Sequence, residues 1–371
     1  MTQRKILIVG SFPGESETQV KGGVRRACSL LEKSRYFKDF ECEVVDSTQK
    51  HYPSSTIWVR CLSAIYRIFK VINILIRRKP DMVLLFCTNG LSFYEKSLTG
   101  LLARGFGSKS VLFPRGSAEF SKLKLLNKLG GIFLRRSNLI ICQGKEIQDF
   151  IQSSYQVNEN KLVVIENWTA TELLLEIGKN RKYLDETVYK ILFVGWLEKS
   201  KGTDNIKDVA KYLSNSKHSY EFHLVGDGSK KDQLEKELKH LELEGKLFFH
   251  SWINDDQLRK LYSSCHIFFL PSWEEGLPNS LIEAMSSGLV PVTTPVGNIP
   301  SILKSGSDGF ICPVKDSKAM IANIDYLLSN TIDLFKMSIE AKTTAEKRFS
   351  TIKNINKLIA ITNSVINGKY D

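Results

Sequence analysis

Residues 270–292 read LPSWEEGLPNSLIEAMSSGLVPV and carry the strongest local pattern of the chain. The apolar run at the start of this stretch predicts a buried strand, and a second apolar run closes it. The middle has the composition of a helix that Asn279 or Ser280 can cap and that Gly288 can end. The stretch therefore predicts strand, loop, helix and strand, which is the repeating unit of a parallel α/β sheet.

The same alternation of short apolar runs with longer segments of helical period extends along the whole chain. In the first half the predicted strands are residues 5–10, 41–47, 81–86, 110–114, 138–142 and 162–166. In the second half they are residues 190–195, 220–226, 246–251, 266–271, 290–294 and 309–313. Continuous apolar strands between helices predict parallel sheets that are covered on both faces. Two such series predict two doubly wound, Rossmann-like domains facing a central cleft, with ligands at the carboxyl ends of the strands.

The domain limits follow from the length of 371 residues and from a polar segment without clear periodicity. We expect an N-terminal domain at residues 1–168 and a linker at 169–188. The C-terminal domain then covers 189–349, and a last helix at 350–371 returns to the N-terminal domain.

The net charge of +12 comes entirely from the first half of the chain. Residues 1–166 contain 26 Lys+Arg and 14 Asp+Glu, whereas residues 167–371 contain 26 of each class. A basic half can bind nucleic acid, an anionic membrane surface or a phosphorylated substrate, or can simply be a solvated surface. The sequence lacks the interleaved aromatic and basic residues of a nucleic-acid platform, so we expect no nucleic acid as partner.

The seven cysteines are scattered without any C-x-x-C spacing, which indicates reduced thiols and no zinc site. No apolar run approaches the ~18 residues that span a bilayer. We therefore expect a cytoplasmic protein that can sit peripherally on the inner face of the cytoplasmic membrane.

Two acids eight positions apart, Glu275 and Glu283, bracket the start of the helix in the first stretch. The N–H groups at a helix N-terminus attract an anion such as a diphosphate, and carboxylates accept hydrogen bonds from sugar hydroxyls. Taken alone, the same spacing also fits an ordinary helix with an N-terminal acid and an outward glutamate.

Three further glycine-containing turns follow predicted strands. Gly195 has no side chain, so a ligand or another loop can approach its backbone closely. Lys201 follows in the same segment and can neutralise a phosphate or simply be solvated. Gly226 lies in a short V-G-D-G turn. Gly22 and Gly23 can start a helix after the first strand, but neither a P-loop nor a G-x-G-x-x-G pattern is present.

These segments together resemble the family-4 glycosyltransferases of glycosyl transferases group 1, retaining enzymes of the GT-B fold. The C-terminal resemblance rests on Val194-Gly195, Lys201-Gly202, Val225-Gly226-Asp227-Gly228, Pro271-Ser272, Glu275-Gly276, Glu283-Ala284, Gly288, Pro291-Val292, Val296-Gly297 and Ile299-Pro300. The looser N-terminal resemblance rests on Gly22-Gly23, Pro114-Arg115-Gly116 and Glu166-Asn167.

The resemblance implies a role for each matched residue. Glu283 would bind the ribose of a nucleotide sugar, and Glu275 would contact the hydroxyls of the donor sugar. Lys201, with Arg115, would stabilise the leaving diphosphate. The remaining donor-binding residues would be Gly22, Gly23, Gly195, Trp196, Gly226, Trp252, Gly276, Leu277, Pro278 and Asn279. Trp196 and Trp252 follow predicted strands, so they can stack on the base or a sugar, or pack at the rim of the site.

Three positions depart from the pattern of the family. Trp196 stands where many members have Arg, which removes one cation from the diphosphate. Arg115 stands where many have His, and Ser301 where many have Glu.

The activity that the resemblance implies is hexosyltransferase-type, retaining transfer from a nucleotide diphosphate sugar, above all a UDP-sugar. The acceptor would be a saccharide or a lipid-diphosphate-linked saccharide in cell-surface polysaccharide synthesis of the O-antigen or capsule type. The nucleotide sugar is a co-substrate, and we expect neither a cofactor nor a metal ion, since no D-x-D stands in a suitable loop. The alternative is a catalytically weak sugar-nucleotide-binding subunit of a polysaccharide assembly complex, suggested by Trp196.

Residues 56–79 predict an amphipathic helix with one polar, largely basic stripe. The stripe consists of Arg60, Ser63, Arg67, Lys70, Asn73 and Arg77, and apolar residues cover much of the rest. Such a helix can lie on anionic lipid, or it can be a crossover helix that packs on its sheet with the basic stripe in water.

Overall fold

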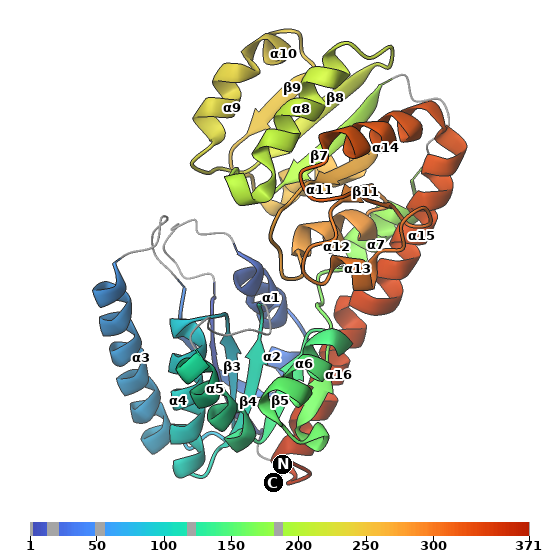
Figure 1. Ribbon diagram of the computed structural model, residues 1–371. Helices are drawn as coiled ribbons and strands as arrows, with labels where there is room; N and C mark the ends of the chain where they lie inside the picture. Colours follow the sequence, from blue (N-terminus) through green and yellow to red (C-terminus); the bar gives the residue numbers. More distant parts are fainter. Residues whose placement is uncertain (1–2, 13–21, 49–55, 117–123, 182–187, 371) are drawn as a thin grey trace. The chain divides into compact units, whose positions relative to one another are not determined.

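The chain divides into two compact units (Figure 1). The computed structural model describes residues 3–12, 22–48, 56–116, 124–181 and 188–370. Unit 1 comprises Met1–Thr169 and Thr351–Asp371, and unit 2 comprises Ala170–Ser350. Each unit is described by itself below.

We expected residues 169–188 to form a linker between the units, and this prediction is wrong. The segment contains helix α7 (Glu172–Lys179), which packs on α12 and α15 within unit 2. The Thr171 hydroxyl caps α7 by accepting a hydrogen bond from the Leu174 N–H at 3.4 Å. The polar composition of this segment reflects a short, partly exposed helix. Residues 182–187 lie outside the described part of the chain.

Unit 1 contains a six-stranded parallel sheet in the order β2-β1-β3-β4-β5-β6. Strand β1, second from the edge, pairs Ile8 with Val44 of β2 on one side and with Leu84 of β3 on the other. The strands are β1 (Lys5–Gly10), β2 (Glu41–Asp46), β3 (Met82–Cys87), β4 (Lys109–Pro114), β5 (Leu139–Cys142) and β6 (Leu162–Val164).

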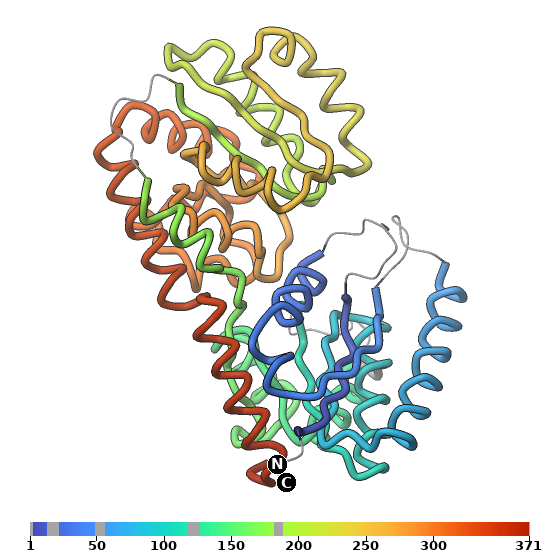
Figure 2. Tube along the Cα trace, turned by 180° about the vertical axis from the view of Figure 1, so that it is seen from behind, coloured from blue at the N-terminus to red at the C-terminus, as the bar shows by residue number. Residues whose placement is uncertain are grey.

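Helices cover both faces of this sheet, as continuous apolar strands require. One apolar cluster joins the sheet to α3 (Ile57–Arg78), α4 (Leu91–Gly105), α5 (Lys124–Arg136) and α6 (Lys145–Tyr155). The opposite cluster joins it to α1 (Gly23–Glu32), α2 (Tyr36–Asp39) and α16 (Thr351–Ile366). Helix α16 runs along unit 1 (Figure 2), and its Thr362 hydroxyl is 3.0 Å from the buried Tyr36 hydroxyl. A short 3₁₀ turn, η1 (Glu159–Lys161), precedes β6.

Unit 2 contains the second six-stranded parallel sheet, in the order β12-β11-β10-β7-β8-β9. The strands are β7 (Tyr189–Val194), β8 (Tyr220–Val225), β9 (Leu247–His250), β10 (Ile267–Leu270), β11 (Val290–Thr293) and β12 (Phe310–Ile311). The remaining helical elements are η2 (Lys199–Lys201), α8 (Thr203–Ser214), α9 (Lys231–Glu237), α10 (Lys239–Leu243), α11 (Asp255–Ser264), α12 (Asn279–Ser286), α13 (Ile299–Ile302), α14 (Ser317–Ser329) and α15 (Thr331–Phe349).

The predicted strands are all present, with ends that shift by one or two residues. Two parallel sheets between helices confirm the predicted fold class of two doubly wound domains. Within the described ranges, no helix is both long and apolar enough to cross a bilayer.

His266, which precedes β10, is buried in unit 2 and is held as a neutral acceptor. Its Nδ1 accepts a hydrogen bond from the Lys190 N–H at 3.0 Å. Burial, together with the nearby Arg181 and Lys190 charges, lowers the pKa of His266 to about 4. In the unfolded chain the same side chain has its ordinary pKa of about 6.5.

We predict that unit 2 loses stability as the pH falls through this window. Between pH 6.5 and pH 4 the unfolded state binds a proton that the folded state does not, at about 1.4 kcal/mol per pH unit. The free energy of unfolding should therefore fall by about 3 kcal/mol through His266 alone. Urea unfolding at a series of pH values checks this prediction. Substitution His266→Asn, which keeps an acceptor without titrating, should flatten the profile, and parallel profiles for both proteins would contradict it.

Candidate active site

The loops after β7 and β10 meet at the point where the strand order of unit 2 changes direction. Parallel strands bring their carboxyl ends to one edge, and such a switch point is where open α/β sheets bind ligands. The Trp273 N–H donates to the Ser200 carbonyl at 2.7 Å, so the two loops are joined through their backbones. The Lys201 Nζ lies 2.6 Å from Glu275 Oε1. Two residues that we predicted to be catalytic are thus in direct contact.

The carboxylate of Glu275 is held from two sides. Besides Lys201, the Ser272 hydroxyl donates to Glu275 Oε1 at 2.8 Å. The Lys201 ammonium also reaches the Glu274 carbonyl at 3.5 Å. This arrangement fixes a cation and a carboxylate side by side at the edge of the sheet, where they can bind an anion and a hydroxyl group respectively.

Two glycines allow the site loops to approach each other this closely. Gly202 has a φ of +74°, and a Cβ there would lie 2.1 Å from the Pro271 carbonyl oxygen. Gly226 has a φ of +146°, and a Cβ there would lie 1.9 Å from the Gly195 carbonyl oxygen. Any other residue at either position would separate the loops, so the backbone requires glycine at 202 and at 226, and the Gly195 carbonyl lies against Gly226.

Helix α12 begins beside this ion pair, one residue earlier than we predicted. Its N-cap is Pro278, with an extended backbone, and Asn279 is the first helical residue, so the prediction of Asn279 or Ser280 as cap is wrong. The proline ring holds φ at −71°, and Pro278 needs no hydrogen-bond partner for its nitrogen. Gly276 and Leu277 precede it in the loop, and Gly288, with φ of +74°, follows the helix as predicted.

Glu283 lies inside α12 and is buried, with 5% of its surface exposed. Its Oε2 accepts a hydrogen bond from the Tyr262 hydroxyl of α11 at 3.2 Å. The sequence predicted the carboxylate but not this tyrosine, because α11 carries no pattern that distinguishes one buried aromatic residue from another.

Trp196 and Trp252 form an edge-to-face pair, with ring centroids 5.2 Å apart at an interplanar angle of 77°. The backbone N–H of Trp252 donates to Asp227 Oδ2 at 3.3 Å, and the indole ring lies close to Gly226. The two tryptophans follow β7 and β9, and the pair provides an aromatic wall beside the turn at Gly226.

The other predicted site residues lie in unit 1. Arg115 follows β4, and its guanidinium carbon is 5.1 Å from the Phe113 ring centroid and 5.3 Å from that of Trp168. Within the described residues its two terminal nitrogens are buried without a hydrogen-bond partner. Burial lowers the pKa of Arg115 to about 10. Gly22 and Gly23 are exposed at the start of α1.

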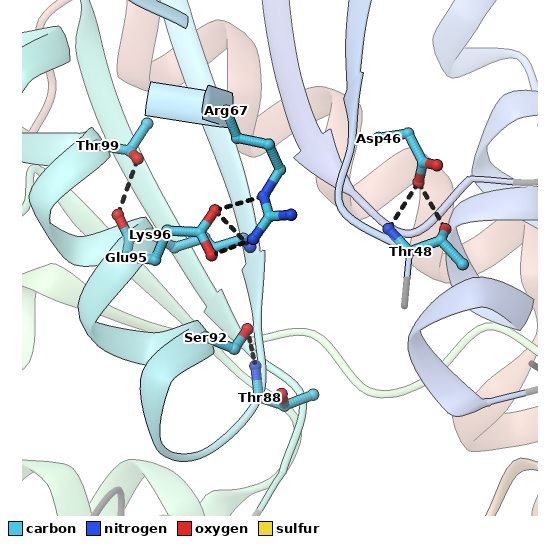
Figure 3. Close-up of polar contacts among 8 residues, drawn as sticks. All are labelled: Asp46, Thr48, Arg67, Thr88, Ser92, Glu95, Lys96 and Thr99. Carbon is cyan, nitrogen blue, oxygen red and sulfur yellow. Dashed lines mark hydrogen bonds and ion pairs between the residues drawn. The ribbon is translucent and has the colours of Figure 1, made fainter. Parts of the chain in front are cut away.

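A cavity of about 890 Å³ in unit 1 includes Gly22 and Gly23 in its wall. It also contains three charged side chains that sequence reasoning did not place in a site, namely Arg67, Glu95 and Lys96 (Figure 3). Glu95 and Lys96 could have been found from the sequence, because they are adjacent residues of opposite charge in the otherwise uncharged segment 91–103.

The cavity adds a further environment for the polar stripe of residues 56–79, beside the water and the lipid that we considered. Arg60, Ser63, Arg67 and Lys70 of the stripe line the cavity; Arg60 and Arg67 are half-buried, whereas Ser63 and Lys70 are exposed. The reason is that α3 packs on the sheet mainly through its C-terminal half, whereas its N-terminal half lies beside the cavity.

In the part of the chain that the structure describes, no group of three or more His, Cys, Asp or Glu side chains could hold a metal ion.

Comparison with known proteins identifies the family of unit 2. Residues 176–347 match the family described as glycosyl transferases group 1. The match covers most of unit 2 and less than half of the chain. The whole fold is similar to a glycosyltransferase from Rickettsia africae, with a TM-score of 0.73, 17% identity and coverage of 99% of this chain and 100% of that one. This glycosyltransferase match agrees with the predicted GT-B fold class.

Two curated relatives of this chain are more informative in sequence. An uncharacterised glycosyltransferase of Haemophilus influenzae is 27% identical over 64% of this chain and 65% of its own length. The Escherichia coli UDP-Gal:alpha-D-GlcNAc-diphosphoundecaprenol alpha-1,3-galactosyltransferase is 24% identical over 65% of this chain and 64% of its own length. The chain thus spans slightly less than two thirds of the length of these relatives.

We predict that the protein is not destabilised when Arg115 is replaced by an apolar residue of similar length. A buried guanidinium without hydrogen-bond partners is costly, and an apolar side chain of similar length can fill the space between Phe113 and Trp168. Arg115→Met should leave the free energy of unfolding of unit 1 unchanged or raise it by up to about 3 kcal/mol. Urea unfolding measures the difference, with the exposed Arg136→Met as control. A loss of more than about 1 kcal/mol would show that Arg115 is a stabilising residue.

Proposed function

We propose that the protein is a retaining hexosyltransferase that uses a nucleotide diphosphate sugar, above all a UDP-sugar. The acceptor is a saccharide or a lipid-diphosphate-linked saccharide in cell-surface polysaccharide synthesis of the O-antigen or capsule type. The observation that carries this proposal is the Lys201–Glu275 pair beside the N-terminus of α12. The E. coli relative supports it, because its name states a UDP-sugar donor and a diphosphoundecaprenol-linked acceptor.

In this proposal the chemistry consists mainly of charge stabilisation and positioning. As the bond between sugar and diphosphate breaks, Lys201 and the first N–H groups of α12 stabilise the negative charge that develops on the leaving diphosphate. Arg115 is proposed as a further cation for this group, and Gly22 and Gly23 as backbone contacts. Since these groups belong to the chain itself, the proposal requires no metal ion and no cofactor.

Glu275 has a different task from Lys201, although the two are in contact. Its carboxylate is fixed by Ser272 and Lys201, so its remaining lone pairs can accept hydrogen bonds from the hydroxyls of the donor sugar. We propose that the new bond forms on the same face of the sugar, as in the family-4 enzymes that the sequence resembles.

The nucleoside part of the donor is assigned to α12 and to the tryptophan pair. Glu283 accepts hydrogen bonds from the ribose hydroxyls, and Tyr262 keeps its carboxylate oriented. Trp196 and Trp252 provide a face for the base beside Gly226. Burial of Glu283 makes its bonds to a ribose stronger than they would be in water.

The alternative is a catalytically weak, sugar-nucleotide-binding subunit of an assembly complex. The observation that favours it is Trp196 at a position where many members of the family carry a second cation. This alternative predicts donor binding without acceptor-dependent turnover, whereas the enzyme transfers sugar with turnover. In either case we propose a cytoplasmic location, peripheral to the inner face of the cytoplasmic membrane, because unit 1 carries the excess of basic residues.

We predict that one nucleotide sugar stabilises the wild-type protein and that Glu283→Gln abolishes this effect. At one hundred times its dissociation constant, a ligand stabilises the native state by about 2.7 kcal/mol. Gln can still accept from Tyr262, so the fold should persist while the charged acceptor for the ribose is lost. Thermal unfolding with UDP-, GDP-, ADP- and CMP-sugars measures the response, and Glu274→Gln in the exposed part of the loop is the control. An equal response in Glu283→Gln would contradict the assignment.

Glu275→Gln is expected to lower turnover with donor and acceptor by about tenfold or more, which corresponds to about 1.4 kcal/mol of transition-state stabilisation. The loss of charge frees Lys201 and weakens the hydrogen bonds to the donor sugar. Release of nucleoside diphosphate measures the rate, with Glu274→Gln again as control. Wild-type turnover in Glu275→Gln would remove this residue from the mechanism.

A further inference from the structure

Arg181 follows helix α7, in the segment that we expected to be a linker. Its guanidinium donates hydrogen bonds to three backbone carbonyls that are distant from it in the sequence. The Nε donates to the Ser287 carbonyl at 2.7 Å, and the two terminal nitrogens donate to the carbonyls of Cys265 and Tyr262. One side chain of unit 2 thus joins three points of the backbone.

The three carbonyls lie at the C-terminal ends of two helices. Ser287 is the C-cap of α12, Cys265 is the C-cap of α11, and Tyr262 lies in the last turn of α11. All three residues are buried. The last carbonyls of a helix have no partner within the helix, and a cation beside them is favourable. Arg181 therefore closes both helix ends at once and fixes α11 against α12.

The same two helices carry the two partners of the buried carboxylate of the candidate site. The Tyr262 hydroxyl of α11 donates to Glu283 Oε2 of α12 at 3.2 Å. Arg181 bonds the backbone of Tyr262 itself and the carbonyl of Ser287, which follows Glu283 by one turn. Ser287 is tied to Glu283 in turn, since its N–H and its hydroxyl donate to the Glu283 carbonyl at 3.1 Å and 3.0 Å. The bonds of Arg181 thus close a ring that includes the Tyr262–Glu283 pair.

Two glycines leave room for Arg181 at the end of α12. A Cβ at Gly178 would lie 2.4 Å from the Ser286 carbonyl oxygen, so α7 packs directly on the backbone of α12. Gly288 has a φ of +74°, and a Cβ there would lie 3.2 Å from both Cδ and Nε of Arg181. Helix α7 lies beside α12 (Figure 1) and packs on α11 as well. This close fit leaves the guanidinium little freedom to move.

We propose that Arg181 is a positioning residue of the donor site, which sets the orientation of Glu283 toward the ribose through Tyr262. This inference rests on the proposed function, in which Glu283 accepts hydrogen bonds from the ribose hydroxyls. A hydrogen bond weakens steeply when its angle is poor, so the carboxylate must be held in one orientation before the ribose binds. Tyr262 holds the carboxylate, and Arg181 holds the helix of Tyr262 against the helix of Glu283.

The experiment compares the affinity of the full chain for UDP with its affinity for 2′,3′-dideoxy-UDP, which lacks the hydroxyls assigned to Glu283. Hydrogen bonds to a charged group contribute about tenfold or more to affinity, so the wild type should prefer UDP by at least about tenfold. Arg181→Met keeps the length of the side chain but removes its donors, and it should lower this preference at least about threefold. Isothermal titration calorimetry measures both affinities.

The ratio of the two affinities separates positioning from a merely structural role. A loss of stability alone would weaken the binding of both compounds by the same factor and leave the ratio unchanged. The matched control is Arg259→Met, because Arg259 of α11 pairs with the Asp256 side chain of the same helix, and this variant should keep the wild-type ratio. Arg181→Lys keeps a cation that cannot reach all three carbonyls, so it should restore part of the preference. It also carries the test if Arg181→Met does not fold.

A double variant tests whether Arg181 acts through Tyr262. Tyr262→Phe removes the hydroxyl that bonds Glu283, so it should lower the preference for UDP by itself. In this background Arg181→Met should have no further effect on the ratio, because residues that act through one contact are not additive. Additive losses in the double variant would overturn the route through Tyr262.

The outcomes distinguish this inference from the proposed function. An unchanged ratio in Arg181→Met would overturn the inference and leave the proposed function intact, since Glu283 would still recognise the ribose. A wild type that binds UDP no better than the dideoxy compound would overturn the assignment of Glu283 to the ribose, and this inference with it.

Discussion

Parallel pairing of β7 with β8 and β10 is the constraint on which the candidate site of unit 2 depends. It brings the carboxyl ends of strands that are far apart in sequence to one edge, and the backbone of each following loop must then pass close to its neighbour. Gly202 and Gly226 make that approach possible, because a Cβ at either position would collide with a carbonyl oxygen. Lys201 and Glu275 can form their ion pair only as a result of this packing.

Both units keep charged groups in buried or partly buried places, and the two units differ in how those charges are balanced. In unit 1, Arg115 is enclosed by aromatic rings, and Arg67 and Lys96 share one carboxylate. Isolated or unbalanced buried charges are costly, so sequences retain them mainly where a ligand uses them. In unit 2 the Lys201–Glu275 pair is balanced, and the cost is correspondingly smaller.

Much of the fold could be predicted, because continuous apolar runs and glycine-containing turns are local signals. The strand positions and both doubly wound series followed from them, as did the loop that carries Glu275. The linker at 169–188 was wrong, since composition does not distinguish a polar linker from a short exposed helix. The cap of α12 was wrong by one residue, because Pro278 serves as an N-cap without any capping side chain. The order of strands within each sheet is not a local property and came from the structure.

The sequence by itself determined which residues form strands and which motifs follow them, because hydrophobic period and glycine placement act within a few residues. Tertiary structure alone decided which way each amphipathic helix faces and which charges share a site. Helix α3 is the clearest case, because its basic stripe was equally compatible with water and with anionic lipid. The choice depended on where α4 and the sheet left a polar space beside it, and that space brought Arg67 to Glu95 and Lys96. Burial and pairing depend on residues distant in the chain, and no local pattern encodes them.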